Sequence, residues 1–184
     1  MSSVQAKSPV TRSHFELFGL PETFAIDQAE LDSRFRRYQA AVHPDRYAAG
    51  SDAERRLALQ LAANGNEAYR TLSDPMRRAA YLCERHGVAI DAERNTAMPA
   101  DFLVAQIEWR EAIDDVRGKP RAAALALGAQ LAAERDAVIG RIGAQLDDAR
   151  DYAAAAAGVR RLMFFDRLQA ELREVLRRPE AGPR

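Results

Sequence analysis

The sequence predicts an all-α protein, and three observations support this class. The 184 residues are rich in alanine, and the alternation of β-branched and polar residues that half-buried strands require is absent. Apolar residues instead recur every three to four positions, as they do in amphipathic helices. Glycine and proline fall between these periodic segments, where they would begin or end helices.

The first part of the chain is predicted to hold a short helix and a longer amphipathic one. The short helix covers about 14–18 and should end at Gly19. Asp27 would cap the second helix, with Glu30 three residues on as its capping-box partner. Pro44 ends this helix, because proline cannot continue it. Its buried face consists of Leu31, Phe35, Tyr38 and Val42.

Two more helices are expected before residue 87. Ser51 and Glu54 form a second capping box, which opens the third helix. Gly65 lies beside the apolar stripe of this helix, where it should cost about 1 kcal/mol relative to alanine and let the neighbouring helix approach closely. Pro75 opens a fourth helix, and Gly87 closes it. The stripe of the third helix consists of Leu57, Leu61, Ala68 and Leu72.

Three longer helices are expected in the second half. They cover about 100–117, 120–146 and 152–177, and the breaks between them contain "GKP" and "DDARD". Residues 87–99 show no period and are interpreted as a linker. The predicted organisation is therefore a first domain over 1–86, ordered from about residue 12, the linker 87–99, a three-helix bundle over 100–177 and a tail over 178–184.

Composition disfavours several classes of function. Lys+Arg and Asp+Glu both number 27, and this zero net charge disfavours a nucleic-acid binder, which usually carries a basic excess. No apolar run approaches the roughly 18 residues of a membrane span. The N-terminus lacks the apolar region of a secretory signal, so a cytoplasmic protein is expected. Nucleophile motifs and phosphate loops are absent, so no catalytic residue is expected.

The single cysteine and the three histidines indicate neither a disulfide nor a metal site. Cys83 is the single cysteine, so no internal disulfide can form. The three histidines stand at no ligand-like spacing from it, and no metal or other cofactor is expected. Cys83 lies in an apolar helical stretch and is expected to be a small buried hydrophobe.

The tripeptide His43, Pro44 and Asp45 stands between the second and third expected helices. It would form the polar tip of a hairpin of antiparallel helices. By itself such a tripeptide does no more than end a helix. Basic residues precede it closely, and at about 100° per residue Arg36 and Arg37 point away from the apolar face of their helix. They are therefore expected to be exposed.

The chain resembles the HscB family of J-type co-chaperones of iron–sulfur cluster assembly. The resemblance rests on "HFELFGLP", "HPDRY", "NEAYRTLSDPMRRAAYL" and "DFLVAQIEWRE", which come in the family's order and extend over about 14–176. It implies an N-terminal J-domain, which is an antiparallel helical hairpin with an HPD loop, plus a C-terminal three-helix bundle. The chain lacks the cysteine-rich zinc module of some eukaryotic relatives and resembles the bacterial type.

The resemblance implies two protein partners and no enzymatic activity of the chain itself. In this family the J-domain stimulates ATP hydrolysis by a DnaK-type chaperone, HscA, and the bundle binds the scaffold protein IscU. A carboxylate held by a proline turn can meet an arginine of the chaperone in a charge-assisted hydrogen bond. The chaperone-contacting residues implied are His43, Pro44, Asp45, Arg36, Arg37 and Arg34. For any single arginine, ordinary solvated charge is the alternative.

The expected fifth helix has two faces of different character. One face is an apolar stripe that includes Phe102, Trp109 and Ile113. A three-helix bundle buries one side of each helix, so the other side should be exposed, and exposed apolar clusters with a charged rim mark interaction sites. We call this side the apolar–acidic strip; it consists of Leu103, Val104, Ile107, Glu108, Glu111 and Asp115. The resemblance assigns it to scaffold binding. The alternative is that the preceding connection covers its first two residues.

Phe164, on the expected seventh helix, completes the predicted scaffold surface. The segment "LMFF" at 162–165 spreads large apolar side chains over most of the helix circumference, so one face cannot bury them all. Leu162 and Phe165 align with the core stripe, whereas Phe164 falls outside it. Exposure is therefore expected, and the resemblance places this residue in the scaffold patch. Burial against the J-domain is the alternative.

Two other functions remain open from the sequence. One is a J-domain protein that serves a different client. The other is a helical nucleic-acid binder that uses the helix carrying Arg34, Arg36 and Arg37. The zero net charge and the apolar–acidic strip argue against the second.

Overall fold

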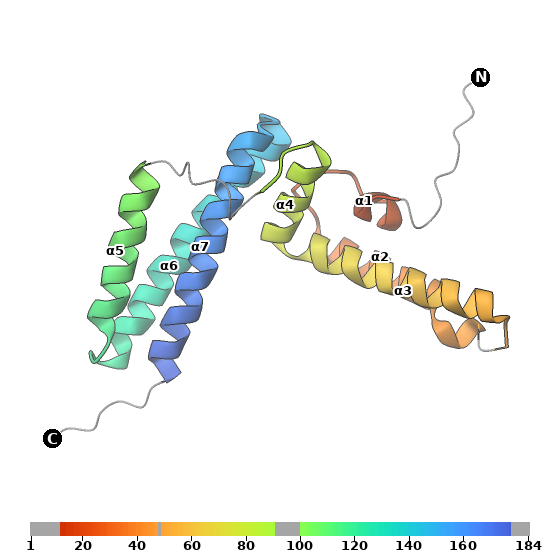
Figure 1. Cartoon of the computed structure of the whole chain (residues 1–184), viewed down its shortest axis with the longest axis horizontal. Coiled ribbons are helices and arrows are strands. Elements are labelled where there is room, and N and C mark those ends of the chain that lie inside the picture. The colour runs from red at the N-terminus through yellow and green to blue at the C-terminus, as the bar shows by residue number, and fades with distance from the viewer. Residues whose placement is uncertain (1–11, 48, 91–99, 178–184) are drawn as a thin grey trace. The chain divides into compact units, whose positions relative to one another are not determined.

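A computed structural model describes residues 12–47, 49–90 and 100–177 of the chain. The described residues form helices and turns without any strand, so the predicted all-α class is confirmed. The chain divides into two compact units, the first ending at Leu82 and the second beginning at Cys83 (Figure 1). None of the helices in the described part combines the length and apolar character needed to cross a bilayer.

The first unit begins with α1 (His14–Phe18), a short helix capped at both ends. Ser13 Oγ accepts a hydrogen bond from the backbone amide of Glu16 at 3.0 Å, and the Glu16 carboxylate accepts one from the amide of Ser13 at 2.7 Å. The helix ends at Gly19, whose φ of 65° lies in the left-handed region that favours glycine. Two caps allow so short a helix to persist and to bury Phe15 and Phe18.

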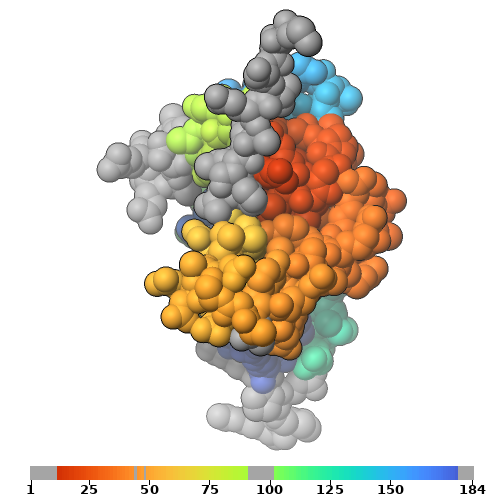
Figure 2. Space-filling view, turned by 90° about the vertical axis from the view of Figure 1, so that its right-hand side faces the viewer, coloured from red at the N-terminus to blue at the C-terminus, as the bar shows by residue number. Residues whose placement is uncertain are grey.

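An antiparallel hairpin of α2 (Gln28–Val42) and α3 (Asp52–Ser73) forms most of this unit. The short 3₁₀ turn η1 (Pro44–Tyr47) follows α2. The predicted stripe of α2 faces inward, and Leu31 is fully buried. The Phe18 ring of α1 meets the Phe35 and Tyr38 rings edge-on, at centroid distances of 6.1 and 5.7 Å. In Figure 2, α1 in red lies directly beside the orange surface of the hairpin.

Gly65 is where the two helices of the hairpin approach closely, as predicted. The Tyr38 ring lies over this glycine, and its hydroxyl donates to the carbonyl of Leu61 at 3.0 Å. A Cβ added to Gly65 would clash with Cε1 of Tyr38. The absence of a side chain at Gly65 therefore lets an aromatic ring fill the space between the helices.

One predicted core position of α3 is wrong. Leu57 was expected in the buried stripe, but 50% of its surface is exposed, whereas the next residue, Ala58, is 2% exposed. Ala58 continues the spacing of three and four residues that runs through Leu61, Gly65 and Ala68. The buried stripe therefore passes through Ala58 and leaves Leu57 beside it.

The helix α4 (Pro75–Arg85) begins directly after α3. Asp74 joins them, and its carboxylate accepts a hydrogen bond from the amide of Arg77 at 2.8 Å. The division between the two units falls within α4, about one helical turn before the domain boundary expected at residue 86. Cys83 lies in this helix and is fully buried, as predicted.

The second unit contains α5 (Ala100–Val116), α6 (Arg121–Gly143) and α7 (Tyr152–Arg177), with a π-helical turn η2 (Ala144–Asp148) at the end of α6 (Figure 1). Arg135 on α6 pairs with Asp166 on α7 at 3.1 Å. The core of the α6–α7 seam is formed by Leu127, Leu131, Val138, Ile142, Val159, Leu162, Leu168 and Leu172.

The predicted terminal and connecting segments are only partly described. The lead-in at 1–11 and the predicted tail at 178–184 lie outside the described residues. The predicted linker at 87–99 is described as far as Ile90, whose carbonyl accepts a hydrogen bond from Arg160 on α7 at 3.1 Å.

Candidate functional site

The loop after α2 presents two polar side chains to solvent. His43 caps the C-terminal end of α2, and its carbonyl accepts a hydrogen bond from the amide of Arg46 at 3.0 Å. The side chains of His43 and Asp45 are 56% and 90% exposed. Both are therefore accessible to a partner protein, while the proline between them starts the turn η1.

His43 and Asp45 also contact each other. The amide of Asp45 donates to Nδ1 of His43 at 3.3 Å, so the neutral imidazole carries its proton on Nε2 in this arrangement. The Asp45 carboxylate lies 3.5 Å from the same Nδ1. The turn thus holds the two side chains next to each other without burying the Asp45 carboxylate.

Arg46 is a residue of this loop that the sequence analysis did not single out. Its Nη1 donates to the carbonyl of Ala40 at 3.1 Å. Carbonyls in the last turn of a helix have no partner within the helix, and a cation near them is favourable. Arg46 therefore ties the loop to the end of α2, and its place next to Asp45 in the sequence was the available signal.

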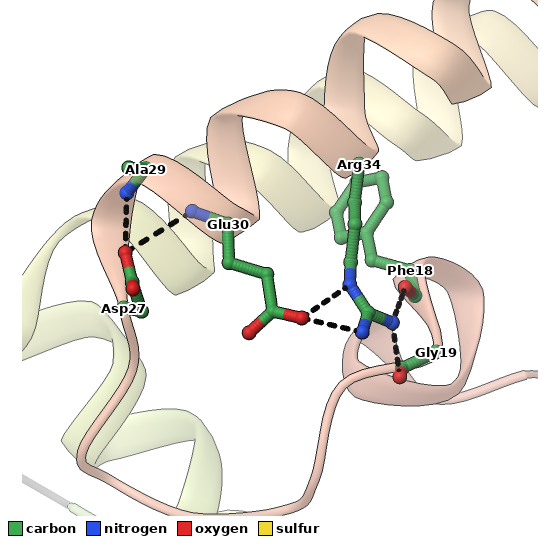
Figure 3. A network of polar contacts seen from close by, with 6 residues as sticks. All are labelled: Phe18, Gly19, Asp27, Ala29, Glu30 and Arg34. Atoms are coloured by element: carbon green, nitrogen blue, oxygen red, sulfur yellow. Dashed lines mark hydrogen bonds and ion pairs between the residues drawn. The ribbon is translucent and has the colours of Figure 1, made fainter.

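The three arginines of α2 do not form one surface. Arg36 and Arg37 are exposed, as predicted. Arg34 is partly buried, and its Nη1 donates to the carbonyls of Phe18 and Gly19 at the end of α1, the first at 2.9 Å (Figure 3). Arg34 thus holds α1 against α2.

The predicted capping box at the start of α2 is half wrong. Asp27 does cap the helix, and its carboxylate accepts a hydrogen bond from the amide of Glu30 at 3.1 Å. The Glu30 carboxylate was expected to return to the Asp27 backbone. It instead pairs with Nη2 of Arg34 at 2.6 Å (Figure 3). The guanidinium, itself bound to the end of α1, offers a charged partner one turn along the helix.

The apolar–acidic strip of α5 is exposed. Leu103, Val104 and Ile107 are 48%, 55% and 59% exposed. The three acidic residues that continue the strip, Glu108, Glu111 and Asp115, are exposed as well. On the opposite face Phe102 and Ile113 are buried, so the two predicted faces of this helix are confirmed. Few proteins leave three large apolar side chains together on a charged helix without a partner.

The expectation that Phe164 lies on the surface is wrong. This residue is 7% exposed, and its ring packs edge-on against Phe102 of α5 at a centroid distance of 5.4 Å. The neighbouring Phe165 makes an edge-on contact with Trp109 at 6.2 Å. Both of these consecutive residues of α7 are therefore buried and have an aromatic partner on α5. Phe164 therefore packs against the buried face of α5. Contact with a partner stays a prediction only for the apolar–acidic strip.

Nothing in the described part of the chain forms a metal site, since no three His, Cys, Asp or Glu residues gather there. Cys83 is buried in the core, and its Sγ lies 3.5 Å from the carbonyl of Tyr152. The loop after α2, Arg36 and Arg37, and the apolar–acidic strip are accessible surfaces suited to contacts with other proteins.

Comparison with known proteins settles the family. A co-chaperone protein HscB homolog of Bordetella avium is 51% identical over 162 residues, covering 88% of this chain and 96% of that protein. One from Burkholderia mallei is 50% identical over 169 residues, or 91% of this chain and 96% of that protein. The chain belongs to the HscB family of co-chaperones. A model of the HSCB C-terminal oligomerisation domain also matches residues 98–173.

Solved HscB structures show the same fold. The chaperone HscB from Vibrio cholerae superposes with a TM-score of 0.82 at 38% identity, covering 89% of this chain and 97% of that one. The human co-chaperone protein HscB gives a TM-score of 0.84 at 25% identity over 92% of this chain and 84% of that one. The predicted J-domain and C-terminal helical bundle are thus the architecture of this family member.

Proposed function

We propose that this HscB-family protein acts in the cytoplasm as an adaptor between an iron–sulfur scaffold of the IscU type and a DnaK-type chaperone of the HscA type. In this proposal the first unit stimulates ATP hydrolysis by the chaperone, and the bundle carries the scaffold. The two surfaces lie on different units of one chain.

The single observation that carries the proposal is the solvent exposure of His43 and Asp45 at the C-terminal end of α2. The hydrogen bond between them uses the backbone amide of Asp45 and leaves its carboxylate oxygens accessible. Arg36 and Arg37 add positive charge to the same helix and would meet an acidic surface of the chaperone. The chain itself would hydrolyse nothing. It would favour one conformation of the chaperone by binding that conformation better.

The apolar–acidic strip of α5 supports the second half of the proposal. Leu103, Val104 and Ile107 offer an apolar centre, and the acidic residues beside them would face basic groups of the scaffold. Hydrophobic anchors with a charged rim are the usual anatomy of a protein interface.

The test is a measurement of chaperone ATPase activity with and without the co-chaperone and the scaffold. We expect His43→Gln and Asp45→Asn to abolish the stimulation while leaving the helical circular-dichroism spectrum and scaffold affinity unchanged. Asp136→Asn, at an exposed position of α6, is the matched control and should stimulate like the wild type. Full stimulation by either loop variant would refute the assignment to the chaperone, and absence of scaffold binding by the wild type would refute the assignment of the client.

A further inference from the structure

A second surface feature of the bundle lies between the end of α6 and the first half of α7. It is a pocket of about 240 Å³, with Val138 and Ile142 on the α6 side. The α7 side is formed by the small residues Ala154, Ala157 and Gly158. A Cβ on Gly158 would lie 2.6 Å from Cγ1 of Ile142, so the helices touch there, and the short side chains on either side leave the hollow.

The polar groups of this pocket suit an anionic group. Arg141 and Arg161 both line it. Arg141 is exposed, and the described residues offer its guanidinium no ion-pair or hydrogen-bond partner. Gln145, on the π-helical turn η2, also lines the pocket, and its buried Oε1 has no hydrogen-bond partner in the described structure. π-Helical turns of this kind occur frequently at functional sites.

The Gln145 amide narrows the class of ligand. A side-chain amide offers an acceptor in one orientation and two donors after a 180° turn. It can therefore meet either a carboxylate oxygen or the backbone N–H of the residue that carries the carboxylate. An aspartate or glutamate of a polypeptide supplies both groups, and its methylene groups would lie against Val138 and Ile142. A free inorganic anion could accept hydrogen bonds here, but it has no methylene groups to place against Val138 and Ile142.

Arg161 connects the pocket with α5. Its guanidinium carbon lies over the ring of Phe102 at 5.0 Å from the centroid. Phe102 directly precedes Leu103, the first residue of the apolar–acidic strip, and is buried on the opposite face of the same turn. Arg161 therefore lines the pocket and also contacts α5, the helix that carries the apolar–acidic strip.

We propose that this pocket receives an aspartate or glutamate side chain of the protein that docks on the apolar–acidic strip. The inference rests on the function proposed above, because the occupant is the scaffold. It gives the docking surface a polarity: the acidic end of the strip faces basic groups of the scaffold, and the basic pocket faces an acidic one. Such a pair of opposite charges fixes the direction in which the partner lies on α5.

The test measures the affinity of full-length variants for a purified IscU-type scaffold by titration calorimetry. Arg141→Glu should weaken binding by about tenfold, since it places like charges opposite each other. Arg173→Glu makes the same change at an exposed position of α7 outside the pocket, and its affinity should stay within about twofold of the wild type. Ala157→Leu keeps both arginines and fills the pocket, and should also weaken binding. A substitution of Arg161 would be ambiguous, because its guanidinium also packs over the ring of Phe102.

Reciprocal variants of the scaffold identify the partner residue. Reversal of one exposed scaffold carboxylate to lysine should restore the affinity of Arg141→Glu, whereas other reversals should not. If Arg141→Glu binds like Arg173→Glu while Leu103→Ala with Ile107→Ala still abolishes binding, the pocket inference is wrong and the strip stands. Normal binding by Ala157→Leu would also overturn it. If the strip variant binds normally, the proposed function itself fails.

Discussion

At the scale of single residues, the arginines of α2 have different roles. Arg34 uses its guanidinium to bind the carbonyls at the end of α1 and the Glu30 carboxylate. Arg37, less than one turn further, is exposed. A sequence motif that treats them alike therefore combines a structural residue with a candidate contact residue.

We predict that Arg34→Ala lowers the free energy of unfolding by about 1–2 kcal/mol, because hydrogen bonds from a charged donor to the end of α1 are lost. Arg37→Ala should change it by less than about 0.5 kcal/mol and should lower the stimulation of the chaperone instead. Urea denaturation and an ATPase assay of both variants, at a temperature where both are folded, make the comparison. The reverse pattern would show that these roles are exchanged.

Cys83 gives a second prediction at this scale. Burial raises the pKa of its thiol to about 11. At pH 8 only about one thiol in a thousand would be the reactive thiolate, and the side chain is also inaccessible. Iodoacetamide should therefore modify the native protein far more slowly than the urea-unfolded protein. Equal rates in the two states would mean that the turn of α4 around Cys83 opens readily in the native protein.

At the scale of helices, close approach decides what a glycine substitution does. Gly65→Ala would bring a methyl group against the Tyr38 ring, and we expect a loss of about 1–3 kcal/mol in stability from this overpacking. Gly140→Ala is the matched control in α6, since nothing lies within 4 Å of its added Cβ. That variant should gain about 0.5–1 kcal/mol from helix propensity. Melting temperatures that move in the same direction would contradict the interlocked hairpin.

The two faces of α5 allow a second test at this scale. Leu103→Ala combined with Ile107→Ala removes exposed apolar groups, so the bundle should melt near the wild-type temperature while scaffold binding is lost. Phe164→Ala removes a buried ring beneath the same helix and should cost about 3–5 kcal/mol. Thermal melts beside a scaffold titration distinguish the faces. A large loss of stability in the double variant, with Phe164→Ala silent, would mean that the faces are exchanged.

At the scale of the whole molecule, the proposed function requires both surfaces on one chain. Joining two sites raises the local concentration of one bound partner near the other. The loop variant His43→Gln and the strip variant Leu103→Ala with Ile107→Ala should each lack the extra chaperone stimulation that scaffold confers. A mixture of the two should show only the basal level of the strip variant. Recovery of the full effect in the mixture would show that the units act independently.

The extent of sequence-based prediction differed between features of the structure for physical reasons. Helix limits and caps depend on neighbouring residues, so α7 begins and ends where the sequence predicted, and the Ser51–Glu54 capping box is present. Glu30 does not form its predicted cap because its carboxylate pairs with Arg34, whose guanidinium is bound to carbonyls at the end of α1. Leu57 lies outside the core because Ala58 takes the buried position in the packing of the helices.

The sequence by itself determined the all-α class, the order and limits of the helices, the exposed loop at His43 and the two faces of α5. These follow from periodicity, caps and breakers, which act over a few residues. Only the tertiary structure decided that Arg34 serves α1, that Phe164 lies beneath α5, and that Arg141 and Gln145 share a pocket with α7. Each depends on a neighbour from a distant part of the chain, and a single helix's pattern carries no record of which neighbour covers it.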